Sequence, residues 1–131
     1  MWRQAHDVAA QCIAPPHHSD GVSCMRTLQD VQNEIDALIR VEWHSDYWSP
    51  LSSLARLTEE VGELAREINH TYGEKPKKVG EKPGNVAFEM GDILFILAAL
   101  ANSINVDLDA AFADVMTKYR ARDSQRWAEN S

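Results

Sequence analysis

One helical segment, about residues 86–105, becomes apolar on nearly every side in its second half, from Ile93 to Ala101. A helix of that composition is expected to be central and buried, with other elements packed around it. The apolar run is less than half of the roughly 20 residues that a membrane span requires. The sequence therefore predicts a fold organised around this helix, inside one helical domain.

Three further segments repeat apolar residues at three- and four-residue steps, which is typical of amphipathic helices. The first runs from Thr27 to about Trp43, the second opens at Ser49-Pro50 and stops at Gly73, and the last begins at Asp107. No segment alternates over the length of a strand, so we expect an all-α fold with a four-helix bundle-type core. The expected core stripes are Leu54, Leu57, Val61, Leu64 and Ile68 on the second helix, and Leu108, Phe112, Val115 and Tyr119 on the fourth.

The chain has 131 residues, enough for a single domain with its own core. We expect residues 1–24, which contain Pro15-Pro16, to be a poorly structured arm ahead of a helical domain at 25–131. Two cysteines are too few for a disulfide framework, which favours a reducing, cytoplasmic setting. A net charge of −7 argues against a general binder of nucleic acids or membrane surfaces.

The second predicted helix gathers Glu59, Glu60, Glu63 and Glu67 within one arc of about 100°. Like charges four residues apart cost about 0.2–0.5 kcal/mol per pair. Gly62 adds a cost of about 1 kcal/mol relative to alanine. Taken alone, this face is equally compatible with a solvated surface and with a ligand site. Local ion pairs are available from Arg56 and Arg66.

The third predicted helix carries Glu89 and Asp92 on the face that becomes core farther along. A buried carboxylate is normally paired or bound to a metal. Gly91 lies between these two acids, just as Gly62 lies among the acids of the second helix, and a small residue would let a backbone or a ligand approach closely. The two helices would pack antiparallel across a lysine-rich loop at 73–84 and bring four to five carboxylates together. Oxygen ligands of this kind suit Mg²⁺ or Mn²⁺.

The order Glu59-Glu60-Val61-Gly62-Glu63, a gap of 25 residues, then Glu89-Met90-Gly91-Asp92 resembles the EExxE…ExxD signature of the MazG-like all-α nucleoside triphosphate pyrophosphohydrolases. The likeness extends from about Met25 to Trp127. It implies a homodimer or homotetramer that cleaves nucleoside triphosphates between the α and β phosphates. The products would be nucleoside monophosphate and pyrophosphate, in a role of nucleotide-pool house-cleaning.

The resemblance also implies roles for individual residues. Mg²⁺, with Mn²⁺ as a substitute, would be held by Glu60, Glu63, Glu89 and Asp92. Glu59 and Glu63 are the predicted catalytic residues, with Glu59 helping to orient the attacking water. The predicted phosphate-binding residues are Lys118 and Arg122, and the predicted base-binding residues are Trp43, His44 and His70.

Other interpretations of these residues stay open. Lys118 and Arg122 would also suit the C-terminal end of a helix as solvated cations, and the aromatic residues near Trp43 would also suit the end of a bundle. The loop at 73–84 fits a lid as well as an exposed linker. Two other functions are compatible with the pattern: a carboxylate-bundle metal protein of redox or storage type, and a non-catalytic helical interaction module.

Overall fold

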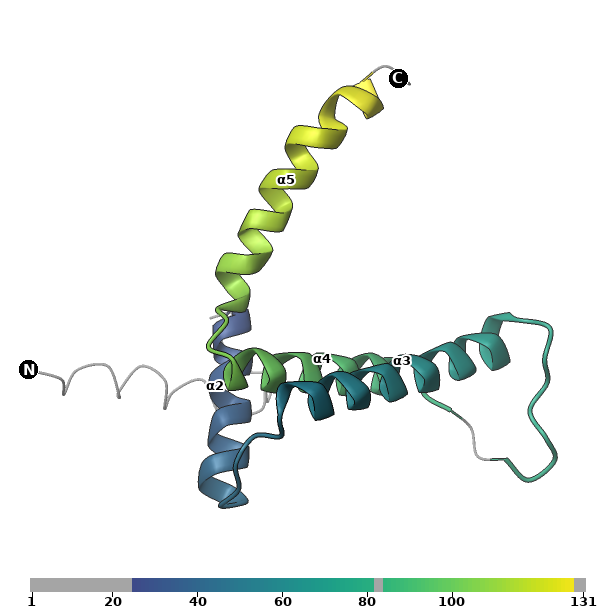
Figure 1. Cartoon of the computed structure of the whole chain (residues 1–131). Coiled ribbons are helices and arrows are strands. Elements are labelled where there is room, and N and C mark those ends of the chain that lie inside the picture. The colour runs from purple at the N-terminus through teal and green to yellow at the C-terminus, as the bar shows by residue number, and fades with distance from the viewer. Residues whose placement is uncertain (1–24, 82–83, 129–131) are drawn as a thin grey trace, which may run out of the picture.

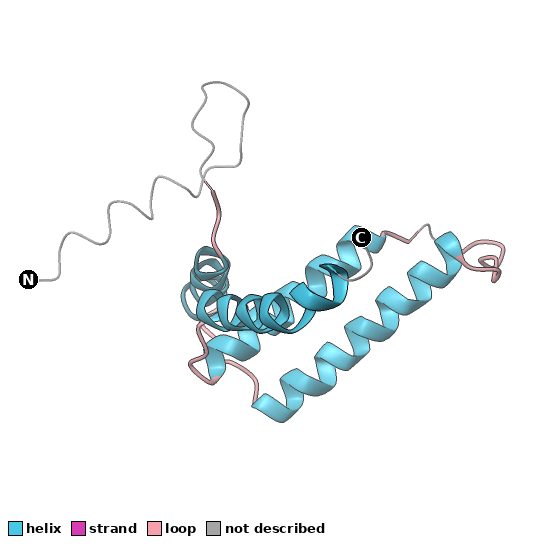
Figure 2. Cartoon of the chain, turned by 90° about the horizontal axis from the view of Figure 1, so that it is seen from above, coloured by secondary structure: helices cyan, strands magenta, loops and turns pink. Residues whose placement is uncertain are grey.

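The computed structural model describes residues 25–81 and 84–128, with side chains up to 123 (Figure 1). Every regular element in this part of the chain is helical and none is a strand (Figure 2), which confirms the all-α prediction. The arm predicted at residues 1–24 lies outside the described residues. The elements are α2 (Leu28–Asp36), the π-helical turn η1 (Ala37–Glu42), α3 (Pro50–Tyr72), α4 (Val86–Ser103) and α5 (Leu108–Ala128).

The predicted helix boundaries hold because their capping chemistry is present. Thr27 caps α2 in a capping box, and Ser49 caps α3 with Pro50 at the first helical position. Gly73 follows the last residue of α3, and Asp107 accepts a hydrogen bond from the backbone N–H of Ala110 at the start of α5. The side chains of Thr27, Ser49 and Asp107 each accept a hydrogen bond from a backbone N–H that would otherwise lack a partner at a helix start.

The first predicted helix differs from expectation in one respect. It continues to Trp43, but its last part, η1, is a π-helix rather than an α-helix. The wider turn is visible in the backbone hydrogen bond from Trp43 N–H to the Leu38 carbonyl, five residues back. The chain then turns through His44, which has a positive φ of 50°.

The core lies where α2 and η1 cross α4. Ile35, Ile39 and Ala98 form its buried centre, and Ala98 is fully inaccessible. An alanine at this position lets the two helices approach closely. Partly buried residues pack around the centre: Val31, Tyr47, Phe95, Ala99 and Leu108.

The expected core stripe on α3 is only partly correct for the single chain, since Leu57 and Leu64 are partly buried. Leu54, Val61 and Ile68 are exposed, with Val61 half-exposed at 50%. The buried residues of α3 are instead Ser53, Glu60 and Glu67, spaced by seven residues and rotated by about 100° from the exposed edge of the stripe. The face that packs on α4 therefore includes carboxylates, and only the far edge of the apolar stripe is turned outward.

The expected core face of α5 is also wrong beyond its first turn. Leu108 packs against the core, but Phe112, Val115 and Tyr119 are exposed. Figure 1 shows why: α5 leads away from α3 and α4 and meets the other helices through α2 at its N-terminal end. The single chain is therefore an open arrangement, in which one hairpin and one projecting helix both leave apolar surface uncovered.

The apolar helix α4 is only partly buried. By length and composition it is the one described helix that could cross a membrane, a test that core helices of soluble proteins also pass. Ile96, Ala98 and Ala101 are buried as expected, whereas Leu94 and Leu97 are about two-fifths exposed at 40% and 39%. The expectation of a fully enclosed helix is therefore only partly met within one chain.

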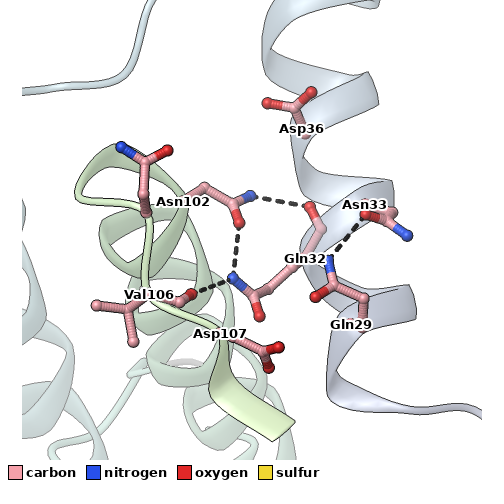
Figure 3. Close-up of a pocket in the computed structure, with 8 residues that line it drawn as sticks. Gln29, Gln32, Asn33, Asp36, Asn102, Val106 and Asp107 are labelled. Atoms are coloured by element: carbon pink, nitrogen blue, oxygen red, sulfur yellow. Dashed lines mark hydrogen bonds between the residues drawn. The ribbon is translucent and has the colours of Figure 1, made fainter. Parts of the chain in front are cut away.

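A polar joint fixes the direction in which α5 leaves the core (Figure 3). The buried Gln32 on α2 donates to the Asn102 side chain at 2.8 Å and to the Val106 carbonyl at 2.9 Å. It also accepts a hydrogen bond from the backbone N–H of Leu108 at 3.0 Å. These bonds tie the α4–α5 turn to α2. Gln32, Asn102 and Val106 line an open pocket of about 340 Å³.

Replacing Gln32 by alanine should destabilise the fold by about 1–3 kcal/mol, because the buried polar groups of Asn102 and the α4–α5 turn would lose their partner. The measurement is urea denaturation followed by circular dichroism. The matched control is Gln29→Ala, since the Gln29 side chain is exposed and donates to Asn33 on its own helix, and its backbone bond to Asp109 does not depend on the side chain. Equal stability changes in the two variants would contradict a special role for the joint.

Candidate functional site

The α3–α4 hairpin sets the register of the acidic residues. Glu60 lies beside Glu89 and Asp92, and Glu67 lies against Gly84. Positions that increase along α3 thus face positions that decrease along α4, which confirms the predicted antiparallel pairing. The buried face of α3 and the first turns of α4 therefore form one continuous acidic strip.

Three of the four predicted metal ligands converge on this strip. One carboxylate oxygen from each of Glu60, Glu89 and Asp92 lies within 4.8 Å of the other two. Glu60 is buried, with 5% of its surface exposed, while Glu89 and Asp92 are partly buried. Three carboxylates from two rigid helices are donors suited to a hard divalent cation, which typically keeps several waters for a phosphate-bearing ligand. The residues present therefore fit such an ion.

Glu89 is the acid most affected by this crowding. Burial raises the pKa of its carboxyl group, and the negative charges of Glu63, Asp92 and Glu60 raise the pKa further. A group in that position favours either a proton or a cation. The electrostatics therefore agree with the geometry that these carboxylates are arranged around positive charge.

A positive charge already lies beside the group. Arg56, one turn earlier on α3, donates to Glu60 at 2.6 Å and to Glu59 at 2.9 Å. The neighbouring acids, Asp92 among them, raise the pKa of the Arg56 guanidinium. The sequence predicts ion pairs for Arg56, but it does not predict that one partner is Glu60, a buried candidate metal ligand. The spacing of four residues between Arg56 and Glu60 was the signal for it.

The other two predicted acids lie outside the three-carboxylate group. Glu59 is exposed and paired with Arg56, and Glu63 is partly buried and forms an ion pair with Arg66. Glu63 is nevertheless close enough to be the leading charge acting on the pKa of Glu89. The catalytic roles of Glu59 and Glu63, and a ligand role for Glu63, stay predictions.

Besides Glu60, one further acid of the described residues is buried: Glu67, for which the sequence predicts no role. It is 3% exposed and accepts a hydrogen bond from the Lys77 ammonium at 2.8 Å. A Cβ atom at position 84 would overlap the Glu67 carboxylate, so a larger residue there would require that carboxylate to move. The signal was the place of Glu67 on the acidic arc, but its partners come from the loop, whose path the sequence does not reveal.

The predicted base-binding residues do not form one cluster in the single chain. Trp43 is 58% exposed and lies against Phe95 of α4, with ring centroids 6.4 Å apart. His44 follows it directly. His70 lies near the far end of α3, about 30 Å from the start of that helix at 1.5 Å per residue. Its side chain is 6% exposed, and its Nδ1 atom contacts the Lys75 carbonyl at 3.0 Å.

The predicted phosphate-binding residues lie on α5, which leads away from the acidic strip of the same chain (Figure 1). Arg122 pairs with Asp123 at 3.0 Å and lies over the Tyr119 ring at 4.9 Å. Lys118 is exposed, one turn earlier on the same helix. The structure therefore does not bring Lys118 and Arg122 to the carboxylates within one chain, and their role stays a prediction.

The two glycines among the acids have open surroundings. A Cβ atom at Gly62 or at Gly91 would meet no atom within 4 Å. The expectation that a backbone approaches closely at these positions is therefore wrong within the described chain. Both glycines are exposed, so the space beside them is available to another molecule.

Comparison with known proteins identifies the family of the chain. The model of the MazG nucleotide pyrophosphohydrolase domain matches residues 48–127. The uncharacterized protein YpjD of Bacillus subtilis is 50% identical over 102 residues, which is 78% of this chain and 91% of YpjD. The crystal structure of YpjD superposes with a TM-score of 0.67 at 47% identity, covering 76% of this chain and 99% of YpjD. A Bacillus-conserved MazG protein, described as a nucleotide pyrophosphohydrolase, gives 0.63 at 46% identity, covering 77% and 97%.

Proposed function

The chain belongs to the MazG nucleotide pyrophosphohydrolase family, and we propose that it is a Mg²⁺-dependent enzyme that cleaves (deoxy)nucleoside triphosphates to nucleoside monophosphate and pyrophosphate. The observation that carries the proposal is the convergence of Glu60, Glu89 and Asp92 across the α3–α4 hairpin. Removal of surplus or non-canonical nucleotides in the cytoplasm is the role we propose for it. Mn²⁺ is the expected substitute metal.

The residues of the strip divide the work of the reaction. Glu60, Glu89 and Asp92 would hold the cation, which when bound supplies charge neutralisation for the phosphates and activation of water. Glu63 would complete the ligand set after leaving Arg66. Glu59, which is exposed and forms an ion pair with Arg56 as Glu60 does, would orient a water and accept its proton. Arg56 would keep Glu59 in position through their 2.9 Å hydrogen bond.

A base site fits the start of α3 better than its end. The exposed Trp43 ring, supported by Phe95, offers a face on which a base can stack. Phe95 lies one turn after Asp92 on α4. The Phe95 ring therefore connects the Trp43 ring to the helix that carries two of the proposed metal ligands. Because the His70 ring is covered by the loop in this structure, Trp43 and His44 are the stronger part of the base-binding proposal.

The direct test is release of pyrophosphate from a panel of canonical, deoxy and modified nucleoside triphosphates with Mg²⁺. We expect pyrophosphate as the first product, with no activity after chelation of the metal. Orthophosphate as the first product would reject the reaction. Iron uptake with the absorbance of a bridged cluster would favour the redox alternative. Di-iron bundles also need histidine ligands, whereas His70 contacts the Lys75 carbonyl and lies outside the carboxylate group.

We also propose that two or four copies of the chain assemble. The apolar stripe of α3, half of α4 and the outer face of α5 are all uncovered in one chain, which is more apolar surface than a monomer usually exposes. A second copy would cover these faces and bring the Lys118 and Arg122 of one chain within reach of the other chain's carboxylates. Both cations are proposed as phosphate-binding residues in that assembly.

Val61→Glu should break the assembly into monomers, because it places a charge in the centre of the uncovered α3 stripe. The measurement is molar mass by size-exclusion chromatography with light scattering. Val79→Glu is the matched control, since Val79 is fully exposed in the loop. An unchanged mass for Val61→Glu would place the interface elsewhere.

A further inference from the structure

The acidic strip extends beyond the proposed metal group. Glu67 lies two helical turns after Glu60 on the same buried face of α3, about 10.5 Å along the helix axis. The hairpin places Glu89 beside Glu60 and Gly84, five residues earlier than Glu89, against Glu67. Trp43 and Phe95 lie at the opposite side of the metal group. The hairpin thus presents an exposed aromatic ring, then three carboxylates, then a carboxylate paired with a cation.

The cation at the end of this strip is Lys77. Its ammonium lies 2.8 Å from the Glu67 carboxylate, and its side chain is 23% exposed. The loop is held down around it by two further contacts: His70 with the Lys75 carbonyl at 3.0 Å, and Gly84 directly against Glu67. Lys77 is therefore fixed over the strip, whereas the neighbouring Lys78 side chain is exposed.

We propose that Lys77, positioned by Glu67, binds the phosphate farthest from the base and so makes the enzyme select triphosphates over diphosphates. The inference rests on the proposed function, since it assigns one more contact to the same substrate. It takes the base to lie at Trp43 and the reacting phosphates at the metal group.

Charge explains why a lysine is needed at this place. A terminal phosphate that extends along the strip would approach the Glu67 carboxylate, and two anions in contact repel each other. An ammonium between them can donate to oxygens of both, and its flexible four-carbon stem lets it follow the phosphate. A diphosphate held with its reacting bond at the metal group would end before Lys77 and gain nothing from it.

The experiment compares binding of two non-hydrolysable ligands with Mg²⁺, by isothermal titration calorimetry. The ligands are the α,β-methylene triphosphate and the α,β-methylene diphosphate of the nucleoside that the wild type hydrolyses fastest. Lys77→Gln should weaken triphosphate binding about tenfold to a hundredfold, the range for a hydrogen bond to a charged group. Diphosphate binding should change by less than about twofold. Lys78→Gln, the same change in charge one residue later, should affect neither.

Two further variants separate positioning from folding. Lys77→Arg should keep most of the preference for the triphosphate, and Glu67→Gln should lower it, because Lys77 would lose its anchor. Equal weakening of both ligands by Lys77→Gln, or no weakening of either, would overturn the inference while leaving the pyrophosphohydrolase proposal intact. A wild type that binds neither ligand and releases no pyrophosphate would overturn both.

Discussion

Glu60→Gln is expected to reduce pyrophosphate release by more than about 100-fold, since loss of even a supporting group around a metal ligand costs 10–100-fold. Glu60 is the most buried of the three converging carboxylates and the only one contributed by α3. Glutamine keeps the shape of the side chain but removes the charge that would hold a cation. The measurement is the steady-state rate of pyrophosphate release at saturating Mg²⁺.

Two comparisons make this result specific. Glu42→Gln removes the same charge from an exposed position on η1 and should leave the rate unchanged. Circular dichroism should show that Glu60→Gln is folded, because Arg56 retains its hydrogen bond to Glu59. A rate within threefold of the wild type would show that Glu60 is not a metal ligand. Glu63→Gln then tests the predicted ligand that the structure places against Arg66.

The helices and the metal group were predictable because both depend on local spacing. Capping residues such as Thr27 and Ser49 act within one helical turn, and periodic apolar residues define a helix without reference to its neighbours. Glu89 and Asp92 share a face for the same reason. Once two such helices were joined by a loop, their antiparallel pairing brought the acids of one to those of the other.

The side of α3 that turns inward was not predictable in the same way. Periodicity shows that Leu54, Val61 and Ile68 form an apolar stripe, but not whether this chain or another covers it. The stripe predicts an apolar core face, whereas the residues of α3 that are buried are Ser53, Glu60 and Glu67. The open direction of α5 follows from the polar joint at Gln32, which depends on contacts some 70 residues apart in the sequence and has no local signature.

The partner of Glu67 shows a third limit. Lys75, Lys77 and Lys78 are equivalent in sequence, since all three lie in a loop without periodicity. Only the folded path of the loop places Lys77 on the buried carboxylate. Gly84, at the end of the loop, has no side chain and leaves room for the Glu67 carboxylate. Contacts of this kind between a loop and a helix cannot be predicted from local spacing and are found only in the folded structure.

Glu89→Gln should stabilise the metal-free protein and abolish its stabilisation by Mg²⁺. In the wild type, bound Mg²⁺ should raise the melting temperature, by about 4–8 °C for each kcal/mol of binding-linked stabilisation. Without metal, the variant should melt above the wild type at neutral pH, because burial and the charges of Glu63, Asp92 and Glu60 oppose ionisation of Glu89 and raise its pKa. The variant should show little or no increase with Mg²⁺, because a cation ligand is gone.

The pH dependence gives this prediction its sign. A carboxyl group whose pKa is raised on folding favours the folded state below its ordinary pKa, and this advantage is lost as the pH rises through the raised value. The gain of Glu89→Gln over the metal-free wild type should therefore be absent in acid and appear as the pH approaches neutrality. Glu74→Gln, at an exposed loop position, should show neither the gain nor the loss of the Mg²⁺ response. If Mg²⁺ raised the melting temperature of Glu89→Gln as much as that of the wild type, the cation would bind elsewhere.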